Sequence, residues 1–195
     1  MTQTDTLNLA LWACNLGRPV AHMDDWLAGV EASAAAAAAE GADILMLPEY
    51  ACAHWLAFAP AGIAADQEIP WLAEQAAAVL PHFASLATRH DMAILAGTGP
   101  VANAQGGYHN QAWLYLPGQP DPIRQNKLCL TPNERNPAAW NLQPGDRLEV
   151  IRWRGLTLLI VTCLDIELPA LSSYISRQVP DLDLVLNPSM TGKPS

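Results

Sequence analysis

The 195-residue chain has 10 basic and 19 acidic residues, and its net charge of −9 argues against binding to nucleic acid or to an anionic membrane surface. Its composition, 51% hydrophobic and 15% charged, is typical of a globular protein with a large core. No apolar run approaches the roughly 20 residues of a membrane span, and the N-terminus lacks the positive region of a signal peptide. We therefore expect a cytoplasmic protein with one domain, residues 1–195.

The cysteines and histidines show no metal-binding pattern. None of the cysteines forms a CxxC pair, and the histidines show neither HxH nor HExxH spacing. The chain is also too long and too rich in core residues for a disulfide scaffold. We expect neither a metal site nor a disulfide framework. The cysteines are Cys14, Cys52, Cys129 and Cys163.

Apolar runs and helical stretches alternate along the chain, which predicts an α/β fold. The predicted strands are 7–14, 43–47, 92–96, 108–116, 123–128, 147–153, 158–163 and 182–186. The predicted helices are 24–40, 68–90 and 168–178, and we expect Pro81 to break or kink the second one. Two long irregular segments, 50–66 and 131–146, lie beside predicted strand ends, where long loops are often functional.

Residues 97–102 match the spacing G-x-G-x-x-A of a dinucleotide-binding fingerprint. That fingerprint needs a helix after it to hold a pyrophosphate, and Pro100, Asn103 and Gly106 interrupt any helix here. We therefore interpret the segment as a turn without a cofactor.

Chemically capable side chains follow several predicted strands. Glu49 comes after the strand 43–47, Lys127 ends the strand 123–128, and Cys163 ends the apolar run that begins at Leu158. Taken singly, Glu49 fits a solvated turn residue, Glu134 fits a surface charge, and Cys163 fits an inert core cysteine. Lys127 is harder to explain in this way, because the other basic residues before the C-terminal tail are all arginines.

Together, three segments resemble the motifs of the nitrilase superfamily of carbon–nitrogen hydrolases. The segments, in chain order, are Leu45–Glu49, Asn126–Glu134 and Thr162–Pro169. Tyr108-His109-Asn110 and Leu186-Asn187-Pro188-Ser189 resemble further landmarks of the family. The resemblance covers essentially the whole chain and implies a four-layer αββα sandwich that lacks its last elements.

The resemblance also implies roles for particular residues. Cys163 would be the nucleophile, Glu49 the general base and then acid, and Lys127 the stabiliser of the oxyanion together with the backbone N–H of Leu164. Glu134 would orient the lysine or the substrate, and a nearby lysine favours the thiolate form of the cysteine. No metal or organic cofactor is implied. Three further residues are predicted to line the substrate pocket: Tyr50, Trp55 and Asn187.

Two departures from the family pattern affect the expected substrate and activity. Leu164 and Asp165 stand where true nitrilases have Trp and Glu, and Cys-x-Asp resembles the amidase and carbamoylase branches. The expected reaction is hydrolysis of a small amide or N-carbamoyl amine through an acyl thioester, and nitrile hydrolysis or acyl transfer with the same triad stays open. The chain is also short for the family, which leaves open a catalytically silent relative that binds a small molecule or a subunit. The resemblance further implies a homo-oligomer.

Overall fold

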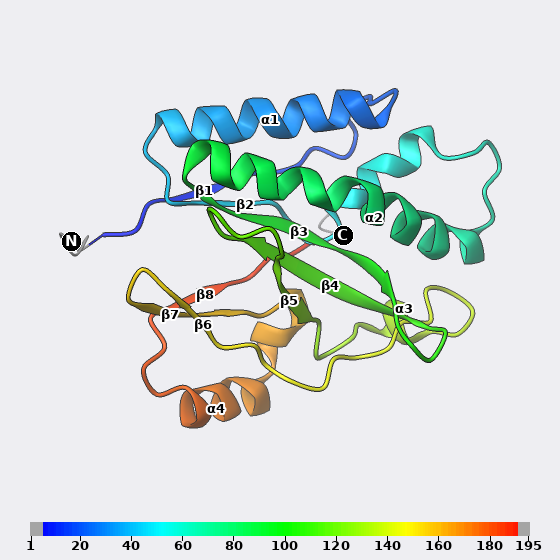
Figure 1. Ribbon diagram of the computed structural model, residues 1–195. Coiled ribbons are helices and arrows are strands. Elements are labelled where there is room, and N and C mark those ends of the chain that lie inside the picture. The colour runs from blue at the N-terminus through cyan, green and yellow to red at the C-terminus, as the bar shows by residue number, and fades with distance from the viewer. Residues whose placement is uncertain (1–5, 191–195) are drawn as a thin grey trace.

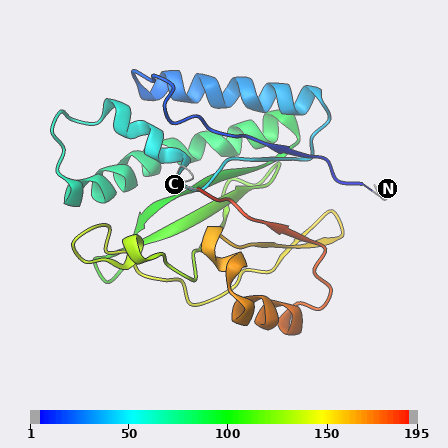
Figure 2. The ribbon, with the colours of Figure 1, turned by 180° about the vertical axis from the view of Figure 1, so that it is seen from behind.

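The computed structural model describes residues 6–190, which form four layers (Figure 1). Helices α1 (Met23–Ala39) and α2 (Ala65–His90) cover one face of a five-stranded sheet, and a three-stranded sheet packs against its other face. Helix α4 (Pro169–Gln178) lies on the outer side of the second sheet, as both views show (Figures 1 and 2). The order of layers is therefore αββα, as the family resemblance implies.

The first sheet has the order β1-β2-β3-β4-β5, and the second has the order β6-β7-β8. Strands β1 and β2 run parallel to β3, whereas β4 is antiparallel to β3 and β5 is antiparallel to β4. In the second sheet β6 and β7 form a hairpin, and β8 pairs parallel to β7. The strands are β1 (Leu9–Leu11), β2 (Ile44–Met46), β3 (Ala93–Ala102), β4 (Tyr108–Tyr115), β5 (Ile123–Asn126), β6 (Ile151–Trp153), β7 (Leu156–Ile160) and β8 (Leu184–Leu186).

Two apolar clusters hold the layers together. One lies between the helices and the first sheet and includes Trp26, Phe83 and Tyr115, and the other lies between the sheets and includes Leu95 and Leu158. Three short helical segments follow the strands β2, β5 and β7. They are η1 (Ala51–Phe58), α3 (Pro132–Arg135) and η2 (Cys163–Glu167).

Of the break or kink expected at Pro81, the break is wrong, because α2 does not end there but continues to His90. The buried positions of α2 recur every three or four residues, so packing of this face maintains the helix. Pro81 and Ala77, whose carbonyl loses its helical partner, are both exposed, and water can satisfy that carbonyl.

The structure also corrects the interpretation of residues 97–102 as a turn. These residues belong to β3, which pairs with β4 across an irregularity between Leu95 and Thr98. Gly97 has a φ of +76°, and an added Cβ would lie 2.4 Å from the carbonyl oxygen of Pro48. The glycine thus permits a close approach of β3 to the chain just before Glu49.

Candidate active site

The three predicted catalytic residues lie within three residues of a strand end. Glu49 comes three residues after β2, Lys127 comes directly after β5, and Cys163 comes three residues after β7. The backbone N–H of Lys127 donates to the carbonyl of Asn110, which extends the pairing of β4 and β5 to this point. The strands therefore determine the backbone position of each of these residues.

The ammonium of Lys127 lies between two carboxylates. Its Nζ is 2.9 Å from Oε1 of Glu49 and 2.8 Å from Oε2 of Glu134. The three side chains are only 1–2% exposed, so their charges face one another with almost no water between them. Burial would lower the pKa of Lys127, but its bonds to Glu134 and Glu49 outweigh this effect and raise the pKa. Lys127 is therefore a fixed positive charge at neutral pH.

A capping box determines the position of Glu134. Thr131 caps α3, its Oγ1 accepts from the N–H of Glu134, and Oε2 of Glu134 accepts from the N–H of Thr131 at 2.8 Å. The hydroxyl of Tyr50 donates to Oε1 of Glu134 at 2.8 Å. Burial would raise the pKa of Glu134, but the bonds from Lys127 and Thr131 outweigh it and lower the pKa. Glu134 is thus an ionised, four-bonded anchor for Lys127, because Asn110 also donates to it.

Asn110 is a site residue to which the sequence assigned no role. Its Nδ2 donates to Oε1 of Glu49 and to Oε1 of Glu134, both at 3.0 Å. The sequence offers only its place in the Tyr108-His109-Asn110 landmark as a signal. Nothing in a local pattern indicates that one amide joins two carboxylates from other parts of the chain.

The second oxygen of Glu49 is also bonded. Oε2 accepts from the backbone N–H of Met190 at 3.0 Å, and the carbonyl of Met190 lies 4.0 Å from the sulfur of Cys163. Oε2 therefore faces Met190, a neighbour of the thiol, whereas Oε1 faces Lys127 and Asn110.

Cys163 is half-buried at the start of η2, with a φ of +49° that is uncommon for a residue with a side chain. Its N–H donates to the carbonyl of Pro188, which continues the alignment of β7 beside β8. Burial, and then the charge of Glu49, raise the pKa of the thiol and outweigh the opposing effect of Lys127. Lys127 favours the thiolate, as expected from the sequence, but burial and the charge of Glu49 together have the larger effect on the pKa of this thiol.

Asp165 connects the two turns that present Lys127 and Cys163. Its buried carboxylate accepts from the N–H of Cys129 at 2.7 Å and from that of Thr162 at 2.9 Å, with a longer bond of 3.4 Å from Leu128. Burial raises the pKa of Asp165, although these N–H donors oppose the shift. The Cys-x-Asp pattern thus has a structural role in this chain.

The remaining predicted residues have varied surroundings. Tyr50 is buried and packs edge-on against Trp140, while Trp55 packs edge-on against Trp26 within the core cluster. The side chain of Asn187 donates to the carbonyl of Val161 at 2.7 Å. Tyr50 therefore contacts the charged cluster through Glu134, whereas Trp55 contributes to core packing.

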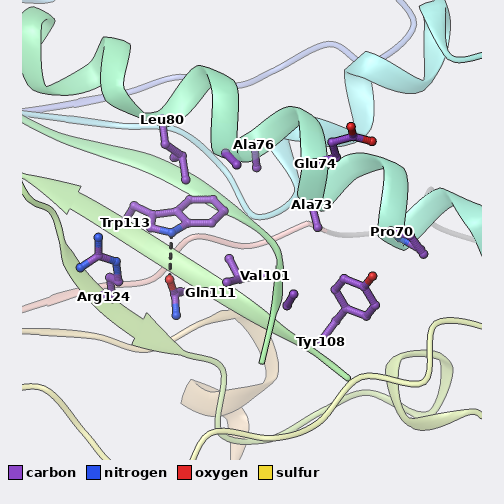
Figure 3. A pocket seen from close by; sticks show the side chains of 12 residues that line it. Pro70, Ala73, Glu74, Ala76, Leu80, Val101, Tyr108, Gln111, Trp113 and Arg124 are labelled. Atoms are coloured by element: carbon purple, nitrogen blue, oxygen red, sulfur yellow. Dashed lines mark hydrogen bonds between the residues drawn. The ribbon is translucent and has the colours of Figure 1, made fainter. Parts of the chain in front are cut away.

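A separate groove lies on the opposite face of β4. It has a volume of about 450 Å³ between α2 and the strands, and Figure 3 shows Trp113 donating to Gln111 on its floor. Because side chains alternate along a strand, Gln111 faces this groove while Asn110 faces the charged cluster. The groove and the cluster are thus on different sides of the same sheet.

Residues 6–190 contain no group of three or more His, Cys, Asp or Glu side chains arranged to hold a metal ion. Within the same residues, no helix combines the length and the apolar character needed to cross a membrane.

The comparisons agree with this fold and this set of motifs. The family model "Carbon-nitrogen hydrolase" matches residues 6–194, and the chain belongs to this family. A curated (R)-stereoselective amidase from Pseudomonas sp. is 30% identical over 102 residues, which is 52% of this chain but only 35% of that amidase.

Solved structures show the same fold. The amidase NitN from Nesterenkonia sp. AN1 superposes with a TM-score of 0.72 and 23% identity, covering 96% of this chain and 69% of that one. A cysteine-to-alanine mutant of this amidase in complex with butyramide gives a TM-score of 0.72, 23% identity and coverage of 96% and 67%. A glutamate-to-leucine mutant carries the acetamide moiety of fluoroacetamide on its active-site cysteine, with a TM-score of 0.71, 23% identity and coverage of 96% and 66%.

Proposed function

We propose that the chain hydrolyses the carbon–nitrogen bond of a small amide or N-carbamoyl amine, with Cys163 as the nucleophile. The observation that supports this most directly is the buried Lys127 ammonium, held by Glu49 and Glu134 at 2.9 and 2.8 Å. A desolvated cation with two fixed partners is expensive to build for stability, because its burial costs solvation energy. It is useful where negative charge develops during a reaction.

In the first half-reaction, Glu49 accepts the proton of the Cys163 thiol as the sulfur attacks the carbonyl carbon. A thiol with a raised pKa needs such a base, because little thiolate is present beforehand. Lys127 and the backbone N–H of Leu164 stabilise the oxyanion of the tetrahedral intermediate. Glu49 then returns the proton to the leaving nitrogen, which departs as ammonia or an amine and leaves an acyl thioester on Cys163.

In the second half-reaction, Glu49 takes a proton from water as the water oxygen attacks the thioester. The carbon–sulfur bond then breaks, the acid product leaves, and the proton returns to the sulfur. Glu134 remains ionised throughout and keeps the ammonium of Lys127 in place, which its lowered pKa supports.

The choice of small amides is supported by the solved relatives, which are described with butyramide and with an acetamide group on the cysteine. The Cys-x-Asp sequence at residues 163–165 supports an amide or carbamoyl substrate over a nitrile. Acyl transfer to an amine would use the same thioester, and hydroxylamine as acceptor would reveal it as a hydroxamate product.

The test is ammonia release from a panel of short aliphatic amides and N-carbamoyl amines. We expect wild type to be active and the Cys163→Ala variant to be inactive. Cys14→Ala is a matched control and should retain activity, because Cys14 contacts His54 rather than the charged cluster. A folded wild-type preparation that neither releases ammonia nor forms a covalent adduct at Cys163 would refute the enzymatic function and favour a silent binding module.

The homo-oligomer implied by the family resemblance and the cytoplasmic location expected from the composition and the N-terminus remain proposals. Ile166 and Tyr174, on the outer layer near α4, are 49% and 47% exposed, which supports association with a second copy. Light scattering of the purified chain would test this, and a monomer at all concentrations would exclude it.

A further inference from the structure

Asn110 occupies the centre of the charged cluster without carrying charge itself. Its two Nδ2 hydrogens point to Glu49 and Glu134, at 3.0 Å each, and the residue is 1% exposed. The amide orientation follows from these partners, because the reversed amide would place its oxygen against two carboxylate oxygens. Asn110 is thus a double donor between two anions.

The amide oxygen of Asn110 indicates that this residue is present for its N–H donors rather than for stability. Oδ1 of Asn110 is buried and has no hydrogen-bond partner among the described residues. A buried acceptor without a partner is destabilising, so the side chain is not optimised for folding. Such residues concentrate at functional sites, where geometry is maintained at the expense of stability.

With Asn110 in place, the two oxygens of Glu49 have different hydrogen-bond partners. Oε1 accepts from both Lys127 and Asn110, which orients the carboxylate so that Oε2 accepts from Met190, whose carbonyl lies 4.0 Å from the sulfur of Cys163. Without Asn110, Lys127 would be the only side chain bonded to Oε1 of Glu49 among the described residues. The carboxylate would then be freer to rotate about its terminal torsion, for which the preferences are broad.

We propose that Asn110 is a positioning residue that links Glu49 to Glu134 and so holds Glu49 in the orientation required for proton transfer with Cys163. This inference deepens the proposed hydrolase function and rests on it for the turnover measurements. Cys163 alkylation provides a second readout that does not depend on turnover.

The test is a graded series at position 110. Asn110→Ser retains one donor, Asn110→Ala retains none, and Asn110→Asp, of the same shape, adds a third carboxylate. Loss of a bond to a charged group corresponds to a decrease of about 10- to 100-fold, so kcat/KM should fall in the order Asn, Ser, Ala, Asp. Gln111→Ala is the matched control, because it changes the adjacent residue on the groove face of β4 (Figure 3).

The diagnostic measurement is the pH dependence of kcat/KM and of Cys163 alkylation by iodoacetamide. The charge of Glu49 already raises the pKa of the Cys163 thiol. Removing an N–H donor from this carboxylate, or adding a third carboxylate beside it, strengthens the negative field at the thiol, so the acid limb should move to higher pH, furthest in the Asn110→Asp variant. A residue that only supports folding would lower the rates without moving this limb. The titratable groups that face this part of the structure are Glu49, Tyr50, Cys52, Lys127, Cys129, Glu134, Cys163 and Asp165.

Each outcome supports or overturns the inference. The graded loss with a shifted acid limb supports it. Activity and alkylation profiles equal to wild type, or a uniform loss with an unmoved acid limb, overturn it. If wild type hydrolyses no amide, the proposed function fails, and the alkylation profiles still decide the role of Asn110. Thermal unfolding identifies variants that do not fold, and Asn110→Ser, the mildest change, then provides the result.

Discussion

Replacement of Asp165 by alanine should destabilise the fold and separate the two turns of the active site. The carboxylate accepts two short bonds from backbone N–H groups, at 2.7 Å from Cys129 and 2.9 Å from Thr162. Hydrogen bonds to charged groups contribute about 1.5–3 kcal/mol each, which gives about 3–6 kcal/mol for the pair. The burial of the charge, which raises the pKa of Asp165, opposes this gain, so we expect a net loss near the lower limit, about 3 kcal/mol.

The assay is urea unfolding at neutral pH, followed by the fluorescence of the buried tryptophans. With a urea dependence of about 2 kcal/mol per molar, the midpoint should fall by about 1.5 M. The Asp165→Asn variant retains one acceptor oxygen and lacks the buried charge, so its free energy of unfolding should be only about 1 kcal/mol below that of wild type. Cys163 alkylation should also slow in the alanine variant, because the turn of Cys163 is no longer tied to the turn after Lys127.

A matched control is Glu31→Ala on α1, whose partners His82 and Arg89 are partly exposed. Surface ion pairs contribute about 0–1 kcal/mol, so this variant should unfold close to wild type. If the Asp165→Ala variant also unfolded within about 0.5 kcal/mol of wild type, the assigned role of these bonds would be wrong.

Two other features of the site give predictions for stability. Because the folded pKa of Glu134 is below its ordinary value of 4.5, its ionised form stabilises the fold above pH 4.5, and this contribution is lost as the pH falls through the lower folded pKa. The Glu134→Gln variant should therefore show a flatter decrease of the unfolding free energy in acid, and an unchanged slope would contradict the assigned bonds. Gly97→Ala should destabilise by more than about 2 kcal/mol, because it adds a contact with Pro48 to the backbone strain. Gly118 has a similar φ, but an added Cβ there would meet no neighbouring atom. The Gly118→Ala variant should therefore lose only about 1–2 kcal/mol of unfolding free energy, measured by thermal or urea unfolding. Equal losses in the two variants would exclude the contact with Pro48 as the cause.

Local patterns predicted where the strands lie and which reactive side chains come near their ends, although β3 continues past the predicted end to Ala102. Buried β-strands and the polar residues that follow them are encoded within a few neighbouring positions, and this applies to Glu49, Lys127 and Cys163. Similarly, the capping box around Glu134 depends on a separation of three residues. The layer order follows from the alternation of strands and helices together with the family resemblance.

The errors occurred where tertiary packing outweighed a local rule. Pro81 lacks an N–H, but the buried face of α2 maintains the helix beyond it. Residues 97–102 look like a turn, yet pairing with β4 and the approach to Pro48 draw them into a strand.

The sequence by itself determined which side chains stand at the ends of strands, because that depends on near neighbours. Only the tertiary structure decided which atoms they meet. Asn110 joins Glu49, 61 residues away, to Glu134, and Met190 bonds Glu49 across 141 residues. The direction of the pKa shift of Cys163 also depends on such neighbours, because burial and Glu49 raise this pKa more than Lys127 lowers it. These contacts depend on how the two sheets and α3 pack, and no short segment of the chain encodes that packing.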